Sequence, residues 1–325
     1  MWKSESLNSV GTVERPSKFL LERGFPRMTI VTPSLNQGRF LEDTITSVLS
    51  QNYPNLEYIV IDGGSTDESL EIIKKYSDRL TYYVSEPDRG HGHALNKGFE
   101  RATGDIMAWL NSDDKYVPGA FQTAAEIFTA HPDIEWITGH HSLWNEDGTH
   151  RYYDNPDSYA DGYSIHRNIY DFLAGSYEWI QQESTFWRRS LWERAGGLIN
   201  EDYRLMVDGE LWCRFFLYAE LWHVDKILAG YRVHSNNRAA VYRKEVIAEM
   251  ERAVSELERR CHPELLPRAE QLKHLYAILK TFDRFRLSGL LEFMFRGVRL
   301  CDGIHYQQLV HRDGSWAKTS LPVFG

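Results

Sequence analysis

The sequence predicts an α/β fold with a mostly parallel central sheet, helices on both faces, and a C-terminal helical extension. Two observations lead to this prediction. Apolar runs of strand length alternate with helical patterns five times between residues 28 and 138, which is typical of parallel strands joined by crossover helices. From about Arg238 onward, apolar residues recur only at helical spacing.

The expected strands are short apolar runs bounded by polar or glycine-rich segments. In chain order they occupy residues 28–32, 56–61, 80–85, 105–110 and 134–138. The patterns between them predict helices at residues 38–51, 68–77, 91–103 and 118–131. Open sheets of this kind bind ligands beyond the carboxyl ends of their strands. The polar segments that follow the strands are therefore where a functional site is expected.

After residue 140 the alternation breaks. Residues 142–145 and 150–153 predict a hairpin, 184–188 a strand, 209–219 a helix, and 221–224 and 228–233 two further strands. We accordingly divide the chain into an N-terminal arm (1–26), a catalytic domain (27–237) and a C-terminal helical region (238–325).

Composition excludes some classes of protein and partner. The net charge is −9 over 325 residues, which argues against non-specific binding to nucleic acid. The three cysteines have irregular spacing, which favours a reducing compartment over a disulfide framework. The start of the chain has no apolar signal core, and no run approaches the ~18 apolar residues of a membrane span. A cytoplasmic location is expected.

One segment stands apart from this acidic chain. Residues 279–300 interleave aromatic and aliphatic residues with five Lys or Arg against two acids. The favoured interpretation is that its helices pack on the catalytic domain or in a homo-oligomer interface. The alternative is peripheral contact with an anionic membrane that bears a lipid-linked acceptor.

Two segments after the first two strands are candidate ligand loops. The first strand ends in TPSLNQG (32–38), where Asn36 offers an amide to a ligand or caps the next helix. The second ends in DGGSTD (62–67), where two glycines let the backbone approach a ligand closely. There Asp62 is a candidate acceptor for a uracil N–H or a ribose hydroxyl, and Asp67 is a helix cap.

Two more segments follow the third and fourth strands. In EPDRGHGH (86–93), Arg89 is a candidate partner for phosphate, and the third glycine of a dinucleotide fingerprint is missing. The buried run IMAWL is followed at once by NSDD (111–114). The adjacent carboxylates Asp113 and Asp114 stay ionised cheaply only beside a cation. They indicate a divalent ion that bridges to substrate phosphates, or else a helix cap.

These four segments, each after a strand and in this order, together resemble those of the family-2 glycosyltransferases with the A-type nucleotide-diphospho-sugar transferase fold. The resemblance covers roughly residues 27–235 and implies inverting transfer from a nucleotide sugar, with UDP as the default nucleotide. It implies that Asp113 holds Mn²⁺ or Mg²⁺, and that Asn111 replaces an aspartate often found there. The nucleotide-binding residues that it implies are Pro33, Asn36, Asp62, Arg89, Asn111 and Ser112.

The resemblance continues in the second half of the chain. QESTFWRR (182–189), which begins with Gln182, resembles the segment on the acceptor side. In VDGELW (207–212), Asp208 takes the place of the catalytic base, with Glu210 as the alternative. In YRVH (231–234), His234 corresponds to a histidine that binds the metal or the diphosphate. Asp114 is a further candidate at the metal.

The expected acceptor is a carbohydrate or lipid-linked hydroxyl in polysaccharide or glycan biosynthesis. The Gln-x-x-Arg-Trp signature of processive synthases is absent from the sequence, which favours a single addition. Two other classes of function remain: a sugar-phosphate nucleotidyltransferase, and a non-catalytic nucleotide-sugar-binding module. The first is disfavoured because residues 32–38 carry one glycine and no basic residue. The second is disfavoured because Asp113 and Asp208 are both present.

Overall fold

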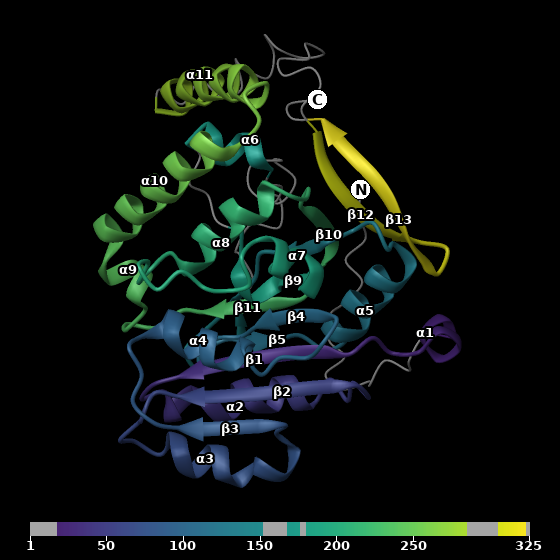
Figure 1. The fold of residues 1–325 in the computed structure, drawn as a ribbon, viewed down its shortest axis with the longest axis vertical. Helices are drawn as coiled ribbons and strands as arrows, with labels where there is room; N and C mark the ends of the chain where they lie inside the picture. Colours follow the sequence, from purple (N-terminus) through teal and green to yellow (C-terminus); the bar gives the residue numbers. More distant parts are fainter. Residues whose placement is uncertain (1–17, 152–167, 176–179, 285–304, 323–325) are drawn as a thin grey trace.

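A computed structural model describes residues 18–151, 168–175, 180–284 and 305–322 of the chain. Its centre is a nine-stranded sheet in the order β13-β12-β10-β6-β9-β4-β1-β2-β3 (Figure 1). The strands of this sheet are β1 (Met28–Ser34), β2 (Leu56–Asp62), β3 (Tyr82–Ser85), β4 (Ile106–Trp109), β6 (Trp136–His140), β9 (Thr185–Arg188), β10 (Trp222–Ile227), β12 (His305–Arg312) and β13 (Ser315–Pro322).

A second, four-stranded sheet has the order β5-β11-β7-β8. Its strands are β5 (Lys115–Tyr116), β11 (Ala229–Arg232), β7 (Leu143–Trp144) and β8 (His150–Arg151). The helices are α1 (Lys18–Arg23), α2 (Gly38–Leu49), α3 (Ser69–Lys75), α4 (His91–Phe99), α5 (Ala120–Ala130), α6 (Ile169–Leu173), α7 (Arg189–Arg194), α8 (Val207–Phe216), α9 (Arg238–Val241), α10 (Arg243–Arg260) and α11 (Leu265–Arg284), with short 3-10 turns η1 (Ser77–Arg79) and η3 (Gln182–Ser184).

The first four strands form the parallel half of the sheet. β1 pairs in parallel with both β2 and β4, and β3 pairs in parallel with β2. All seven residues of β1 are buried. Because alternate side chains of a strand point to opposite faces, both faces are covered. The crossover helices predicted from the sequence lie between these strands, so the expected α/β class is confirmed.

β9 is the exception to the parallel arrangement. It lies between β4 and β6 and runs antiparallel to both. Beyond it, β10 pairs in parallel with β6 and β12. The hairpin predicted at residues 142–153 corresponds to the antiparallel pair β7 and β8.

Four tryptophans pack where α8 crosses the antiparallel part of the sheet. Trp212 on α8 stacks on Trp109 of β4 at a centroid distance of 5.8 Å and on Trp136 of β6 at 5.5 Å. Trp187 of β9 packs edge-on against Trp212 at 5.8 Å. Aromatic pairs bury large areas and prefer such defined geometries. They fix the position of α8 on the sheet.

The C-terminal part differs from the prediction. Helices α9, α10 and α11 agree with it, but residues 305–322 form the antiparallel hairpin β12–β13, so the helical prediction is wrong there. The turn contains Asp313 (φ 50°) and Gly314 (φ 77°). Asp-Gly is a strong signal for a two-residue hairpin turn, and the helical interpretation overlooked it.

The hairpin belongs to the core of the catalytic domain. Leu309 is fully buried, and Trp316 is 8% exposed. The Trp316 indole donates to Glu126 Oε2 over 3.3 Å, and His131 Nε2 lies 2.8 Å from the Trp316 carbonyl oxygen. Both partners belong to or follow α5. The sheet therefore extends beyond the boundary predicted at residue 237.

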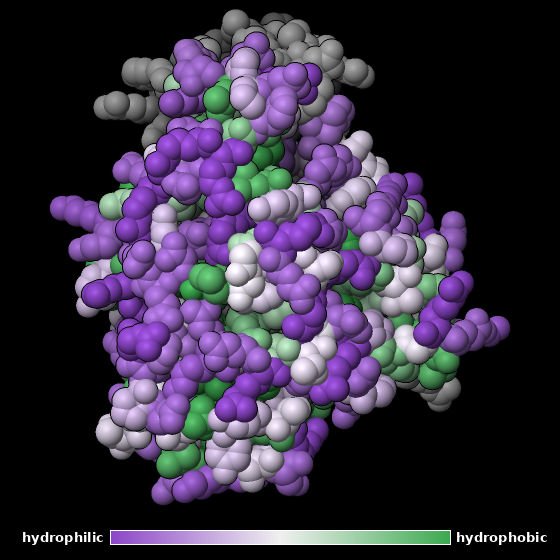
Figure 2. All heavy atoms as spheres, in the orientation of Figure 1, coloured by the Kyte–Doolittle hydropathy of each residue, from purple (hydrophilic) through white to green (hydrophobic). Residues whose placement is uncertain are grey.

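The two ends of the chain are only partly described. In the predicted N-terminal arm, residues 18–23 form α1, whose Leu20 is fully buried; residues 1–17 lie outside the described part. Most of the basic and aromatic segment 279–300 also lies outside it. Among the described helices, none combines the length and the apolar character that crossing a bilayer requires. On the face in Figure 2, hydrophilic residues predominate, with small apolar areas between them.

We predict that Leu309→Ala lowers the free energy of unfolding of the whole domain by about 2–5 kcal/mol, the usual cost of deleting a buried aliphatic side chain. Thermal and urea unfolding of the full chain measure it. Val310→Ala, at the next position of the strand and half-buried, is the control and should cost less. Equal losses in the two variants would contradict the packing of the hairpin into the core.

Candidate active site

The candidate residues of the first half of the chain follow the carboxyl ends of β1, β2, β3 and β4, and these strands lie side by side in the parallel part of the sheet (Figure 1). The first two strands end in register, since Ser34 pairs with Asp62. The loops that follow the four strands therefore leave the sheet on the same edge, as expected for an open parallel sheet.

Asp62 lies at the end of β2 with no exposed surface. Its Oδ2 accepts hydrogen bonds from the backbone N–H of Gly64 (3.2 Å) and Ser65 (2.9 Å) and from the Ser85 hydroxyl (2.6 Å). Its Oδ1 accepts from the Ser65 hydroxyl at 2.5 Å. These donors occupy the carboxylate inside the protein, so Asp62 shapes the glycine-rich loop rather than facing outward.

Asn36 joins the first two loops. Its Oδ1 accepts from Thr66 N at 2.8 Å, and its own N–H donates to Ser65 Oγ at 2.7 Å. Its backbone is left-handed, with φ 52°, a conformation that asparagine tolerates better than most residues. Pro33 is buried within β1, and Ser112 is 4% exposed. The three residues thus build the edge that the nucleotide is predicted to meet.

Arg89 lies on the surface and forms an ion pair with Glu201. Its Nη2 donates to Glu201 Oε2 at 2.9 Å and its Nε to the same oxygen at 3.1 Å. The Arg89 side chain is 68% exposed. Exposed ion pairs contribute about 0–1 kcal/mol. A phosphate could therefore replace Glu201 as the partner of the guanidinium at little cost.

Asn111 is the centre of a polar network behind β4. Its Nδ2 donates to Asp114 Oδ2 and to Gln182 Oε1, each at 3.2 Å, and its Oδ1 lies 3.1 Å from His91 Nε2. Gln182 in turn donates to the carbonyl oxygen of Trp109 at 2.7 Å. Burial lowers the pKa of His91 to about 4, so His91 is neutral and donates to Asn111.

Asp113 and His234, the two predicted metal ligands, lie together. His234 Nε2 is 3.0 Å from Asp113 Oδ2, and His234 Nδ1 accepts from Asn236 N at 3.2 Å. The ring proton therefore lies on Nε2, between the two groups. A divalent cation would take the place of that proton. Within the described residues no cluster of three or more acidic, histidine or cysteine side chains could hold a metal.

A two-ligand pair suits a cation that shares its coordination with a substrate. Magnesium and similar ions often use one or two carboxylates plus phosphate oxygens instead of a full protein cage. The Asp113 side chain is 18% exposed, so it is not closed off from solvent. The pair therefore fits Mn²⁺ or Mg²⁺ bound jointly with a diphosphate.

Asp114 is buried and has different partners from Asp113. It has no exposed surface and accepts from Arg232 N at 2.8 Å. Burial and the neighbouring charges of Glu183 and Asp113 raise the pKa of Asp114 well above its usual value. Burial raises the pKa of Glu183 to about 7. Burial thus favours the uncharged form of both acids, and a part for Asp114 at the metal stays a prediction.

This arrangement corrects the reasoning from adjacent carboxylates. Asp114 is fully buried and its raised pKa favours the uncharged form, so repulsion between the two acids gives less reason to expect a cation between them. The case for a metal therefore depends on Asp113 and His234 alone.

Arg232 is hydrogen-bonded to both Asp113 and Asp114. Its side chain is 2% exposed. Its guanidinium donates to the Asp113 carbonyl oxygen at 2.7 Å and to Asp43 Oδ2 at 2.9 Å. It also lies over the Phe40 ring, 4.9 Å from its centroid. It therefore holds residues 113 and 114 in place from inside, close to His234.

Asp208 lies in the first turn of α8. Burial raises its pKa to about 6, and the charge of Glu249 adds to this. The charge of Asp208 in turn raises the pKa of Glu183. A carboxylate with a pKa near neutrality is suited to accept a proton.

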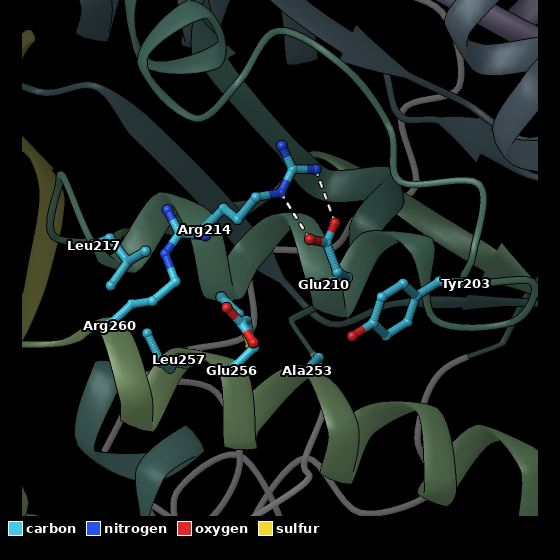
Figure 3. Close-up of a pocket in the computed structure, with 9 residues that line it drawn as sticks. Tyr203, Glu210, Arg214, Leu217, Ala253, Glu256, Leu257 and Arg260 are labelled. Atoms are coloured by element: carbon cyan, nitrogen blue, oxygen red, sulfur yellow. Dashed lines mark hydrogen bonds and ion pairs between the residues drawn. The ribbon is translucent and has the colours of Figure 1, made fainter.

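Glu210, the alternative base, has different partners. Both of its carboxylate oxygens accept from Arg214, each at 2.8 Å. Figure 3 shows this pair on the side of α8 that faces α10. Residues two apart on a helix point in different directions. In this structure Glu210 is therefore bound in an ion pair with Arg214, and its role as the alternative base stays a prediction.

Three residues of the site escaped sequence analysis: Glu183, Arg232 and His91. Glu183 follows Gln182 directly, and Arg232 lies two residues before His234. Their places within these two motif segments were therefore a signal that sequence analysis had available. His91 begins α4, and helix-start polarity seemed a sufficient explanation for it.

The comparisons with known proteins agree with this geometry. The model of the glycosyl transferase family 2 matches residues 29–183. An uncharacterized glycosyltransferase of Rickettsia conorii is 28% identical over 211 residues, which cover 64% of this chain and 34% of the relative. The putative teichuronic acid biosynthesis glycosyltransferase TuaG of Bacillus subtilis is 35% identical over 127 residues, 38% of this chain and 50% of the relative. The matches thus span a third to a half of these relatives.

Two solved structures share the fold. Residues 1–349 of S. aureus TarS in complex with UDP-GlcNAc align with a TM-score of 0.59 at 15% identity, covering 76% of this chain and 71% of that one. The mannosyltransferase PcManGT of Pyrobaculum calidifontis, in complex with GDP-Man and Mn²⁺, aligns with a TM-score of 0.52 at 19% identity, covering 83% and 81%. The match to the glycosyl transferase family 2 model thus lies in residues 29–183, the part of the chain that carries the loops at the carboxyl edge of β1, β2, β3 and β4.

Proposed function

We propose that this protein is an inverting glycosyltransferase that adds one sugar from a nucleoside-diphosphate sugar, UDP by default, to a hydroxyl acceptor. The proposal depends on two kinds of side chain, a pair suited to a metal ion and a carboxyl group suited to accept a proton. The Asp113–His234 pair suits a metal-bound diphosphate, and Asp208, with its pKa of about 6, suits a proton acceptor. The putative role named for TuaG, teichuronic acid biosynthesis, supports a part in glycan or polysaccharide synthesis.

The donor would lie along the carboxyl edge of β1, β2 and β4. The glycine-rich loop that Asp62 shapes lets a nucleoside approach the backbone. Asn36 and the segment 111–113 line the neighbouring loops. Arg89 would exchange Glu201 for a phosphate oxygen. When bound at Asp113 and His234, a divalent ion would neutralise the diphosphate and so favour its departure.

Asp208 would act on the acceptor. As the acceptor oxygen forms its bond to the anomeric carbon, its proton passes to a carboxylate oxygen of Asp208. The bond between the anomeric carbon and the diphosphate oxygen breaks on the opposite side. The electron pair of that bond leaves with the nucleoside diphosphate. Attack opposite the leaving group inverts the configuration.

We expect UDP or GDP to bind more tightly with Mn²⁺ than without it, because the cation links the diphosphate to Asp113 and His234. Isothermal titration calorimetry with each nucleotide, with and without Mn²⁺, measures the difference. Asp113→Asn should remove it, and Asp78→Asn, which alters an exposed acid on η1, should not. Equal affinity with and without metal, or no binding, would argue against the metal role.

Asp62→Ala should weaken nucleotide binding roughly tenfold or more, since each hydrogen bond to a charged group is worth about 1.5–3 kcal/mol and the loop loses several. The fold should remain intact by circular dichroism. Asp62→Asn keeps the size of the side chain and should have a smaller effect. Unchanged affinity in a folded Asp62→Ala variant would remove Asp62 from the donor site.

For the base, Asp208→Asn should reduce turnover by ~10²–10⁴-fold and leave nucleotide affinity unchanged. Slow hydrolysis of the donor provides an assay without a known acceptor, because water must also lose a proton. For the wild type we expect kcat/KM to fall as pH drops through about 6, where Asp208 becomes protonated. Glu210→Gln is the matched variant and should affect stability more than turnover. Near-normal turnover in Asp208→Asn would refute the assignment.

A further inference from the structure

The segment before α8 has no capping side chain of its own. Its N-cap residue is Met206, which makes no side-chain hydrogen bond to the helix. The first N–H groups of a helix have no partner within the helix and need one from elsewhere. The N–H of Met206 is the first of these groups, two residues before Asp208, so the partner that it finds helps to set the position of Asp208.

Glu249 of α10 supplies the partner from 43 residues further along the chain. Its Oε2 accepts from the backbone N–H of Leu205 (2.9 Å), Met206 (3.0 Å) and Arg204 (3.1 Å). Its Oε1 accepts from Arg204 N at 3.0 Å. Successive N–H groups that converge on one anion form a nest, a backbone geometry suited to negative charge.

Other residues of α10 hold the same segment. Arg252 donates to the Asp202 carbonyl oxygen at 2.8 Å, and its guanidinium lies 3.8 Å from the centroid of the Tyr203 ring. Met250 packs against Gly209, where an added Cβ would lie 3.0 Å from the Met250 sulfur. Figure 3 shows α10 beside α8, with Tyr203 at the N-terminal end of α8. Contacts from α10 therefore extend along the chain from residue 202 to residue 209.

We propose that Glu249 is a positioning residue, which holds the backbone of residues 204–206 so that Asp208 is presented to the acceptor. The inference rests on the proposed role of Asp208 as the base. It assigns to the C-terminal region, outside the part matched by the family model, a function in the reaction.

The charge of Glu249 has a second effect. It faces Asp208 from α10, while Glu183 faces it from η3, and the charge of Glu249 helps raise the pKa of Asp208. Removing that charge should therefore lower the pKa of Asp208. The acidic limb of kcat/KM should then move to lower pH, a change that loss of stability alone does not produce.

Two variants separate the hydrogen bonds from the charge. Glu249→Gln removes the charge and keeps an oxygen that can accept from the N–H groups. Glu249→Ala removes both. Glu251→Gln, an exposed acid on the same helix, is the matched control. Donor hydrolysis as a function of pH, nucleotide affinity, thermal unfolding and amide hydrogen exchange at residues 204–206 are measured in the full chain, with Asp208→Asn alongside.

We expect Glu249→Ala to lose roughly tenfold to hundredfold in kcat, the scale of a misplacement of about 1 Å. Amide exchange at residues 204–206 should be faster, with nucleotide affinity unchanged. Glu249→Gln should lose less and shift the acidic limb downward. The control should match the wild type.

The role of Glu249 would be overturned if both variants kept the wild-type kcat and the same acidic limb of the pH profile of kcat/KM. If Asp208→Asn were inactive in that case, the proposed base would still stand. Unchanged amide exchange in a folded Glu249→Ala variant would overturn it equally. An active Asp208→Asn variant would instead refute the proposed function. In that case Glu249 has no base to position, and the inference falls with it.

Discussion

The hydrogen bond between the buried acids Asp114 and Glu183 is the constraint on which the site depends. Two carboxyl groups inside a protein cannot both ionise cheaply. Here burial and the charge of Glu183 raise the pKa of Asp114, and the backbone N–H of Arg232 donates to its Oδ1. Asp114 has no exposed surface, whereas the side chain of its neighbour Asp113 is 18% exposed. The two adjacent acids of this loop therefore lie in different surroundings, one fully buried and one partly open to solvent.

A second constraint acts from the opposite side of the sheet's carboxyl edge. The stacking of Trp212 on Trp109 and Trp136 ties α8 to β4 and β6. The strand that precedes the Asp113 loop and the helix that begins near Asp208 therefore share one aromatic contact. The loop of Asp113 and the first turn of α8 are therefore joined through the core as well as through the chain between them.

Local patterns predicted the first half of the chain well. Polar residues directly after each apolar run placed the loops of Asn36, Asp62 and Asp113 correctly, because strand ends and turn residues leave a local signature. The partners of these residues were not predictable in this way. Arg232 reaches Asp43 across 189 positions, and Glu249 reaches the loop before α8 from another helix. The spacing of apolar and polar residues along the chain gives no information about such distant pairs. The Asp313-Gly314 turn was different, since its signal was present and was outweighed by the helical pattern before it.

The place of the C-terminal hairpin has a consequence for how the protein is made. β10 lies between β6 and β12, so during synthesis its outer edge stays unpaired while α9, α10 and α11 are being added. An unpaired strand edge is a template for unwanted pairing with other chains. The sheet closes only when residues 305–322 leave the ribosome. We therefore expect chains stalled before this point to aggregate even though every loop of the active site has already been synthesised.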